Sequence, residues 1–134
     1  MSFLGQNSPL AGKRVLVIED TIENLRLFRA ILQLEDAQVL EASQARVGIE
    51  IAQRELPDVI LMDMQMPELD GLSATRLLRS DALTRHIPII MITASAMHED
   101  RQRALDAGCS GYITKPVEPM NFGRQIAGFM DNSN

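Results

Sequence analysis

Several residue types that build particular kinds of site are scarce in this chain. Its 134 residues include no tryptophan, one tyrosine, two histidines and one cysteine. A single cysteine, Cys109, cannot form an internal disulfide. The two histidines, His86 and His98, are too few and too distant in sequence from the acidic residues described below to indicate a zinc site.

Excess positive charge and long apolar segments are also absent. The formal net charge is −5, which excludes broad binding to DNA or RNA. The longest apolar runs, such as 87–92, fall far short of the ~20 residues that cross a bilayer. Met1 to Gly12 lacks the charged start and apolar middle of a signal peptide. Together these absences favour a cytoplasmic protein that works neither on nucleic acid nor in a membrane.

The composition that remains suits one globular domain, with 46% hydrophobic and 23% charged residues. Apolar segments rich in β-branched residues predict strands at 15–18, 38–41, 58–62, 87–92 and 111–114. Apolar residues at helical spacing predict helices at 22–32, 44–54, 72–79, 96–107 and 120–130. No repeat or linker interrupts this pattern, so we divide the chain into a flexible lead-in at 1–12, one domain at 13–130 and a tail at 131–134.

Strands that alternate with helices need crossover connections, and these give a parallel sheet covered by helices on both faces. We therefore predict an α/β, doubly wound fold with five parallel strands and five helices. Ile22 starts the apolar face of the first helix, and Val47 and Ile51 are expected to point inward from the second. Gly108 is expected to end the fourth helix in a left-handed conformation.

Polar residues follow the predicted strands at the points where the strands end. Glu19 and Asp20 follow the first strand, Asp63 the third, Thr93 the fourth and Lys115 the fifth. In open parallel sheets, ligands bind in the crevice beyond the carboxyl ends of the strands. We therefore expect these five residues, far apart in sequence, to meet at one edge of the sheet.

Three neighbouring carboxylates raise one another's pKa and oppose folding unless a positive charge neutralises them. A hard divalent cation does this, and Mg²⁺ prefers oxygen ligands. Lys115 adds a second positive charge, and Thr93 adds a hydroxyl donor. A carboxylate such as Asp63 can act as a nucleophile and form an aspartyl phosphate. Because phosphoryl transfer needs mainly positioning and charge neutralisation, this set of residues suits that reaction.

Simpler interpretations apply to some of these residues when each is taken alone. Asp20 could be an ordinary residue at a helix start, although its acidic neighbours argue against this. Asp70 with Gly71 indicates only a turn and a helix start. Three methionines at alternate positions suggest core packing rather than a metal site, since thioethers do not suit Mg²⁺. Of these, only Met62 is expected to be well buried.

Four segments in order resemble the receiver domain of two-component response regulators. They are residues 17–20 (VIED), 61–71 (LMDMQMPELDG), 92–94 (ITA) and 112–116 (YITKP). The resemblance covers roughly residues 13–130, and agreement of several motifs is far more specific than one. It implies a flavodoxin-like strand order, 2-1-3-4-5. The Glu19–Asp20 pair followed by Asn24 resembles stand-alone receivers of the chemotaxis or cell-cycle-regulator type and of phosphorelays.

The resemblance also implies roles for individual residues. Asp63 would be the phosphoacceptor, and it would hold Mg²⁺, or Mn²⁺ in its place, together with Asp20 directly, Glu19 through water and the backbone carbonyl of Gln65. Thr93 and Lys115 would hold phosphoryl oxygens.

The switch and the partners are likewise implied by the resemblance. Tyr112 would turn inward when Thr93 moves toward the phosphate, and the Lys115–Pro116 peptide would be cis. The donor would be a sensor histidine kinase or a histidine phosphotransfer protein. With no output domain after Asn134, the signal is expected to pass to a downstream protein through the last two helices and the last strand. Such a chain is a phosphoacceptor switch that catalyses only its own phosphorylation and dephosphorylation.

Other classes of α/β protein fit less well. A haloacid dehalogenase-type phosphatase needs a second Asp two positions after its nucleophile, and this chain has Gln65 there. A flavodoxin-like FMN carrier and a dinucleotide-binding domain need a phosphate-binding loop after the first strand, where Glu19 and Asp20 stand instead. A receiver that has lost its chemistry and acts as a binding module would lack a central residue, and all are present.

Overall fold

The computed structural model describes residues 8–131. Its strands are β1 (Arg14–Ile18), β2 (Gln38–Ala42), β3 (Val59–Asp63), β4 (Ile89–Thr93) and β5 (Gly111–Thr114). Its helices are α1 (Ile22–Leu34), α2 (Ala45–Glu55), α3 (Gly71–Ser80), α4 (His98–Ala107) and α5 (Pro119–Asp131). All strands pair in parallel, in the order β2-β1-β3-β4-β5. The predicted fold and strand order are confirmed.

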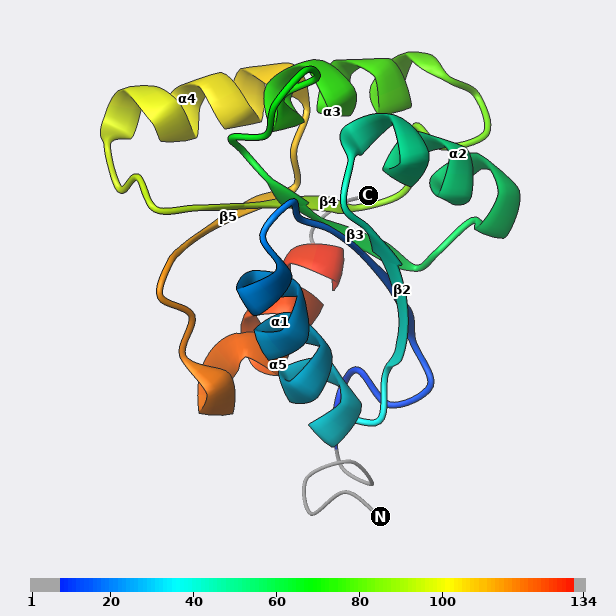
Figure 1. Ribbon diagram of the computed structural model, residues 1–134, viewed down its shortest axis with the longest axis vertical. Helices are drawn as coiled ribbons and strands as arrows, with labels where there is room; N and C mark the ends of the chain where they lie inside the picture. The colour runs from blue at the N-terminus through cyan, green and yellow to red at the C-terminus, as the bar shows by residue number, and fades with distance from the viewer. Residues whose placement is uncertain (1–7, 132–134) are drawn as a thin grey trace.

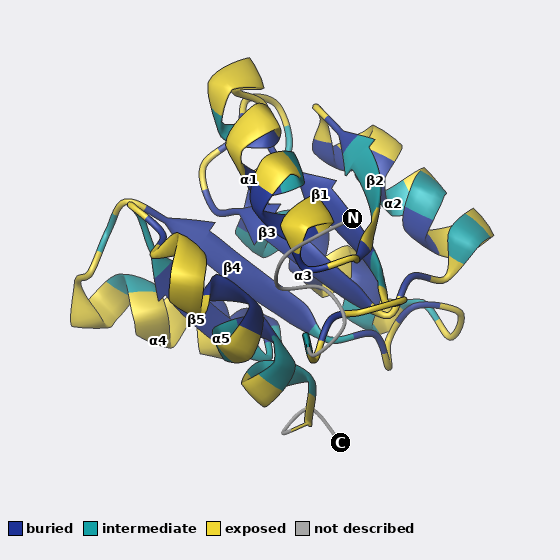
Figure 2. Cartoon of the chain, turned by 90° about the horizontal axis from the view of Figure 1, so that it is seen from below, coloured by how far each residue is buried: buried dark blue, intermediate teal, exposed yellow. Residues whose placement is uncertain are grey.

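Helices cover both faces of the sheet, as crossover connections require. Helices α1 and α5 lie on one face, and α2, α3 and α4 lie on the other (Figure 1). The central strands are buried along their whole length, whereas the outer sides of the helices are exposed (Figure 2). Two apolar layers therefore hold the sheet between them. Each helix within residues 8–131 is too short or too polar to span a bilayer.

The register of the strands brings their carboxyl ends to one edge. Ile18 at the end of β1 pairs with Met62, and Asp63 at the end of β3 pairs with Ile92. Thr93 at the end of β4 is aligned with the last residue of β5, directly before Lys115. The polar residues that follow these strands are therefore placed at the same edge by backbone pairing alone.

Helix ends follow the local sequence. The Asp70 side chain accepts a hydrogen bond of 2.8 Å from the Ser73 amide and caps α3. Gly108 ends α4 with a φ of 108°, which confirms its predicted left-handed conformation. Helix α4 begins at His98 rather than at residue 96, because Met97 is extended and its amide donates to the Ser95 hydroxyl at 3.2 Å.

Two apolar residues predicted to face the core are exposed. Val47 is 41% exposed and Ile22 is 58% exposed. The buried side of α2 is built from small residues instead, and a Cβ at Gly48 would lie 2.3 Å from a side-chain atom of Ile18. Helix α2 therefore packs too closely on β1 for Val47 to fit between them. Ile51 is half-buried and packs against the core, as expected.

Other residues are more buried than the sequence indicated. Met64 and Met66 belong to the core together with Met62, so the expectation that only Met62 is buried was wrong. Both lie in the loop between β3 and α3. Leu10 is fully buried, although it falls within the predicted lead-in, of which residues 1–7 lie outside the described part of the chain. The division of the chain at residues 12 and 130 stays a prediction.

Candidate functional site

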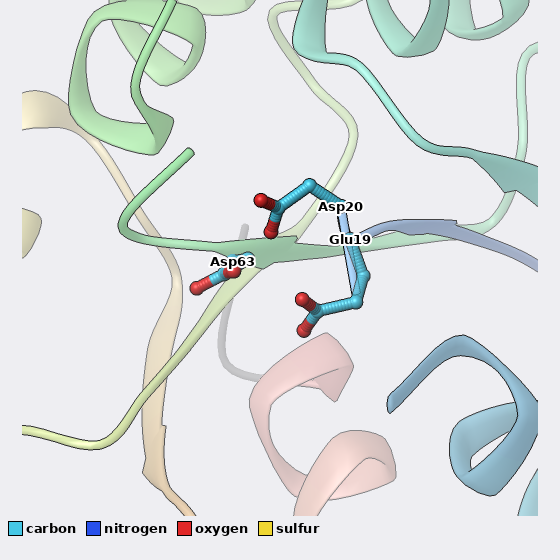
Figure 3. Close-up of side chains that lie close together, drawn as sticks. All are labelled: Glu19, Asp20 and Asp63. Carbon is cyan, nitrogen blue, oxygen red and sulfur yellow. The ribbon is translucent and has the colours of Figure 1, made fainter. Parts of the chain in front are cut away.

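Three carboxylates meet at the carboxyl edge of the sheet. Glu19 and Asp20 follow β1, and Asp63 ends β3 (Figure 3). One carboxylate oxygen of each lies within 4.8 Å of the others. Glu19 and Asp63 are buried, whereas Asp20 is exposed. The cluster predicted from the sequence is therefore present, with one carboxylate open to solvent.

A single cation lies against this cluster among the described residues. The Lys115 Nζ atom is 3.0 Å from Glu19 Oε1 and 3.8 Å from Asp63 Oδ1. The second oxygen of Glu19 accepts a hydrogen bond from the Thr21 amide at 3.3 Å. Both Glu19 oxygens are thus engaged by the protein. One ammonium facing three carboxylates leaves the pocket with an excess of negative charge.

The excess negative charge alters the titration of Asp63. Burial, followed by the neighbouring Glu19 carboxylate, raises the pKa of Asp63 to about 7. Lys115 and the Gln65 amide, which donates to Asp63 Oδ1 at 3.2 Å, oppose this rise only in part. A carboxylate in this state gains from any added cation, and oxygen donors at this spacing suit a hard divalent ion such as Mg²⁺.

The loop after β3 needs a glycine to hold Asp63 in place. Gly71 starts α3, and a Cβ there would lie 2.4 Å from the Asp63 carbonyl oxygen and 2.9 Å from the Met64 Cα. Its amide donates to the Met64 carbonyl at 3.0 Å. No larger residue fits this approach, so the turn interpretation of Gly71 extends to a role in shaping the pocket.

On the other side of the pocket, Thr93 is buried at the end of β4. Its carbonyl accepts from the Lys115 amide at 2.7 Å, and its hydroxyl oxygen accepts from the Ser95 amide at 3.2 Å. The Tyr112 ring is buried, and its hydroxyl donates to the Ser95 carbonyl at 2.8 Å. The peptide bond between Lys115 and Pro116 is cis.

Sequence reasoning missed the contact between this region and α4. Ser95 is bonded to Asp100 in the first turn of α4, and Asp100 is paired with Arg103. Asp100 and Arg103, with Gln65, border a cavity of about 470 Å³ between the β3–α3 loop and α4. The first turn of a helix is a common place for an acidic residue, so nothing in the sequence distinguished Asp100 from Glu99.

The fold, the acidic cluster and the facing lysine together define a phosphorylation-based signalling domain of the kind that uses a bound divalent cation. Residues 15–127 match the family model of the response regulator receiver domain. The chain is 35% identical over 121 residues to the polar-differentiation response regulator DivK of Brucella ovis. The aligned residues cover 90% of this chain and 98% of DivK.

Solved structures agree with this match. The receiver domain of the sensor histidine kinase PA1611 from Pseudomonas aeruginosa PAO1 is 34% identical, with a TM-score of 0.83 over 90% of this chain and 99% of that one. It holds a magnesium ion coordinated in its active site cleft. The chemotaxis protein CheY4 of Vibrio cholerae is 28% identical, with a TM-score of 0.79 over 84% of this chain and 93% of that one.

This chain belongs to the response regulator receiver domain family. It is a phosphoacceptor signalling protein, and the family implies a histidine kinase as its partner. The related PA1611 receiver domain holds magnesium in its active site cleft, and this chain has an acidic cluster suited to such an ion, formed by Glu19, Asp20 and Asp63.

Proposed function

We propose that Asp63 is the residue that receives the phosphoryl group. The observation that carries this proposal is its position as a buried carboxylate between two other carboxylates and the Lys115 ammonium. A buried nucleophile with a cation 3.8 Å away is protected from water and faces a positive charge that can hold an incoming phosphoryl oxygen. The remaining residues of the pocket then have definable roles.

The metal would be held by Asp20 and Asp63 directly. Asp20 is the exposed member of the cluster and is open to an ion that keeps several waters. Both oxygens of Glu19 are engaged by Lys115 and Thr21, which supports contact through water. The Gln65 backbone carbonyl completes the proposed ligands. When bound, the ion neutralises the oxygens of the transferred group.

In the reaction, one Asp63 carboxylate oxygen attacks phosphorus while the bond from phosphorus to the donor's imidazole nitrogen breaks. The departing nitrogen keeps the electron pair of that bond and takes a proton from solvent. Lys115 donates to one phosphoryl oxygen and Thr93 to another. Because the attacking oxygen must be ionised, the raised pKa of Asp63 makes the metal-free pocket a poor acceptor below about pH 7.

The donor is proposed to be the phosphohistidine of a sensor histidine kinase or a histidine phosphotransfer protein. The output is proposed to pass to a downstream protein through the surface that α4, β5 and α5 form at the β5 edge of the sheet. Tyr112 belongs to β5, and its hydroxyl is bonded to the Ser95 carbonyl, two residues after Thr93. A phosphoryl group on Asp63 that moves Thr93 would therefore also change the hydrogen bond that holds Tyr112 in β5.

The proposal is tested by incubating the full chain with acetyl phosphate, with and without Mg²⁺, and measuring the protein mass. One phosphoryl group should be gained only with Mg²⁺, and Asp63→Asn should abolish the gain. Asp20→Asn should weaken Mg²⁺ binding by roughly tenfold or more. Asp58→Asn is the matched control, because Asp58 precedes β3 at the opposite end of the strand.

Acid-labile phosphate on the Asp63→Asn chain would refute the assignment of the acceptor. If the unaltered chain gained no mass at any Mg²⁺ concentration, the rival interpretation as a binding module would hold instead. Asp58→Asn should be labelled as fully as the unaltered chain, which would show that the loss in Asp63→Asn comes from the position of Asp63 and not from the removal of one carboxylate.

A further inference from the structure

Ser95 is bonded in three directions. Its amide donates to the Thr93 hydroxyl oxygen at 3.2 Å, and its carbonyl accepts from Tyr112 at 2.8 Å. Its own hydroxyl donates to Asp100 in the first turn of α4 and accepts from the Met97 amide at 3.2 Å. Ser95 therefore connects the two proposed switch residues, Thr93 and Tyr112, to helix α4.

Asp100 is held in position to receive that hydroxyl. Its second carboxylate oxygen pairs with Arg103, one turn further along α4. The hydrogen bonds from Ser95 and Arg103 hold the pKa of Asp100 below its usual range, so it stays an ionised acceptor at neutral pH. An exposed ion pair of this kind stabilises the fold little, but it fixes the direction of the carboxylate.

The contact to Thr93 decides what its hydroxyl can do. A threonine hydroxyl has one proton to donate and two lone pairs. Because the Ser95 amide occupies a lone pair, the proton is left for another acceptor, and the direction of the occupied lone pair limits where that proton points. Tyr112 holds the Ser95 carbonyl, and Asp100 of α4 holds the Ser95 side chain, so loss of the contact with α4 removes one of the supports that fix the direction of the Ser95 amide.

We propose that Asp100 is a positioning residue, which through Ser95 holds the Thr93 hydroxyl in the orientation that a phosphoryl oxygen on Asp63 requires. This inference rests on the proposed function. It adds that a side chain of α4 contributes to the chemistry of the pocket.

A purely structural role for Asp100 is the competing explanation. An acidic residue in the first turn stabilises a helix through the helix dipole, whether or not it touches Ser95. Glu99 is exposed in the same turn and has the same charge. Glu99→Ala therefore removes the dipole contribution but leaves the contact with Ser95 in place, which makes it the matched control.

The experiment measures phosphorylation rates with acetyl phosphate and saturating Mg²⁺ for Ser95→Ala, Asp100→Ala and the double variant. Each single change should slow the reaction about three- to tenfold, the effect of one lost hydrogen bond. The double variant should be no slower than either single variant, because both remove the same contact. Glu99→Ala should react at the normal rate, and Ser95→Thr, which keeps the hydroxyl, should recover most of it.

A second measurement uses the fact that Tyr112 is the only tyrosine and that the chain has no tryptophan. Tyrosine fluorescence therefore reports Tyr112 alone. It should change in Asp100→Ala and stay constant in Glu99→Ala, while Mg²⁺ affinity, set by the acidic cluster, should be equal in all of these variants.

Rates for Asp100→Ala equal to those for Glu99→Ala, or losses that multiply in the double variant, would overturn the proposal. If Asp100→Ala does not fold, Ser95→Ala alone decides, since a normal rate with its hydroxyl removed contradicts the inference. Labelling of Asp63→Asn in the same assay would instead overturn the proposed function, so the two failures are distinguishable.

Discussion

Helices α4 and α5 lie on opposite faces of the sheet and are held there by different interactions (Figure 1). Helix α5 inserts Phe122 and Ile126, which are both fully buried. The Phe122 ring stacks on Phe28 of α1 with the ring centroids 5.7 Å apart. Moving α5 would expose this aromatic pair to water, which costs several kcal/mol. Helix α5 is therefore a fixed part of the fold.

Helix α4 buries only two alanines, Ala104 and Ala107. Polar contacts hold its ends: Asp100 binds Ser95 at the first turn, and the Gly108 carbonyl accepts from Arg79 at 2.8 Å after the last. A hydrogen bond can be exchanged for one with water at a small net cost. Helix α4 is therefore held by contacts that water can replace, whereas α5 is held by buried side chains that water cannot replace.

The difference between α4 and α5 is tested most directly by removing one apolar side chain from each helix. Phe122→Ala should lower the free energy of unfolding by about 3–5 kcal/mol, through lost burial and the cavity left behind. Leu105→Ala on α4 should change it by less than about 0.5 kcal/mol, since Leu105 is 47% exposed. Urea unfolding followed by circular dichroism measures both, and equal losses would show that α4 is anchored as firmly as α5. Phe122→Leu replaces the alanine variant if that one does not fold.

The Asp63 carboxylate is expected to have a smaller effect on the free energy of unfolding. Its charge destabilises the fold, in contrast to the apolar side chains of α5, which stabilise it. Burial and the Glu19 carboxylate raise the pKa of Asp63 from its ordinary value of 3.8 to about 7, so the folded chain binds more protons than the unfolded chain between these values. Without metal, stability should therefore fall as pH rises from about 4 to about 7, by about 1–3 kcal/mol for this group. Asp63→Asn removes this dependence and should be the more stable protein at pH 8.

Thermal unfolding at pH 5 and pH 8 in the presence of a chelator measures this difference between the two chains. The gap in melting temperature should narrow at pH 5, where Asp63 is protonated, and again at pH 8 when Mg²⁺ is added. Asp106→Asn, an exposed carboxylate on α4, controls for the general loss of one charge. A gap that is independent of pH would contradict the raised pKa.

These expectations also separate what the sequence could predict from what it could not. The strand order was predicted from the resemblance to receiver domains, and the helix start at Asp70 and the left-handed Gly108 were predicted from neighbouring residues. The acidic cluster was predictable because parallel strands bring their ends together. Each of these follows from local chemistry or from the rules of the fold.

The errors came from contacts between elements that are distant in sequence. Val47 was placed inward by helical spacing alone, but Gly48 packs on Ile18 of β1 and turns Val47 outward. Leu10 lies in the turn before β1, and this turn places its side chain in the core beside α1 and α5. Asp100 gained its proposed role from Ser95, a neighbour that periodicity does not reveal.

The smallest expected effect compares one glycine at each helix. Gly108, after α4, has a φ of 108°, and a Cβ there would lie 2.9 Å from the Arg79 Cγ. Gly128 lies in α5 with nothing within 4 Å of an added Cβ. Gly108→Ala should therefore lower the free energy of unfolding by about 1–2 kcal/mol, while Gly128→Ala should raise it by about 0.5 kcal/mol through higher helix propensity. Urea unfolding measures both. A loss at Gly128 or a gain at Gly108 would show that the backbone at these two glycines does not differ as described, whereas opposite signs would confirm that Gly108 needs its left-handed conformation and that Gly128 is an ordinary helical position.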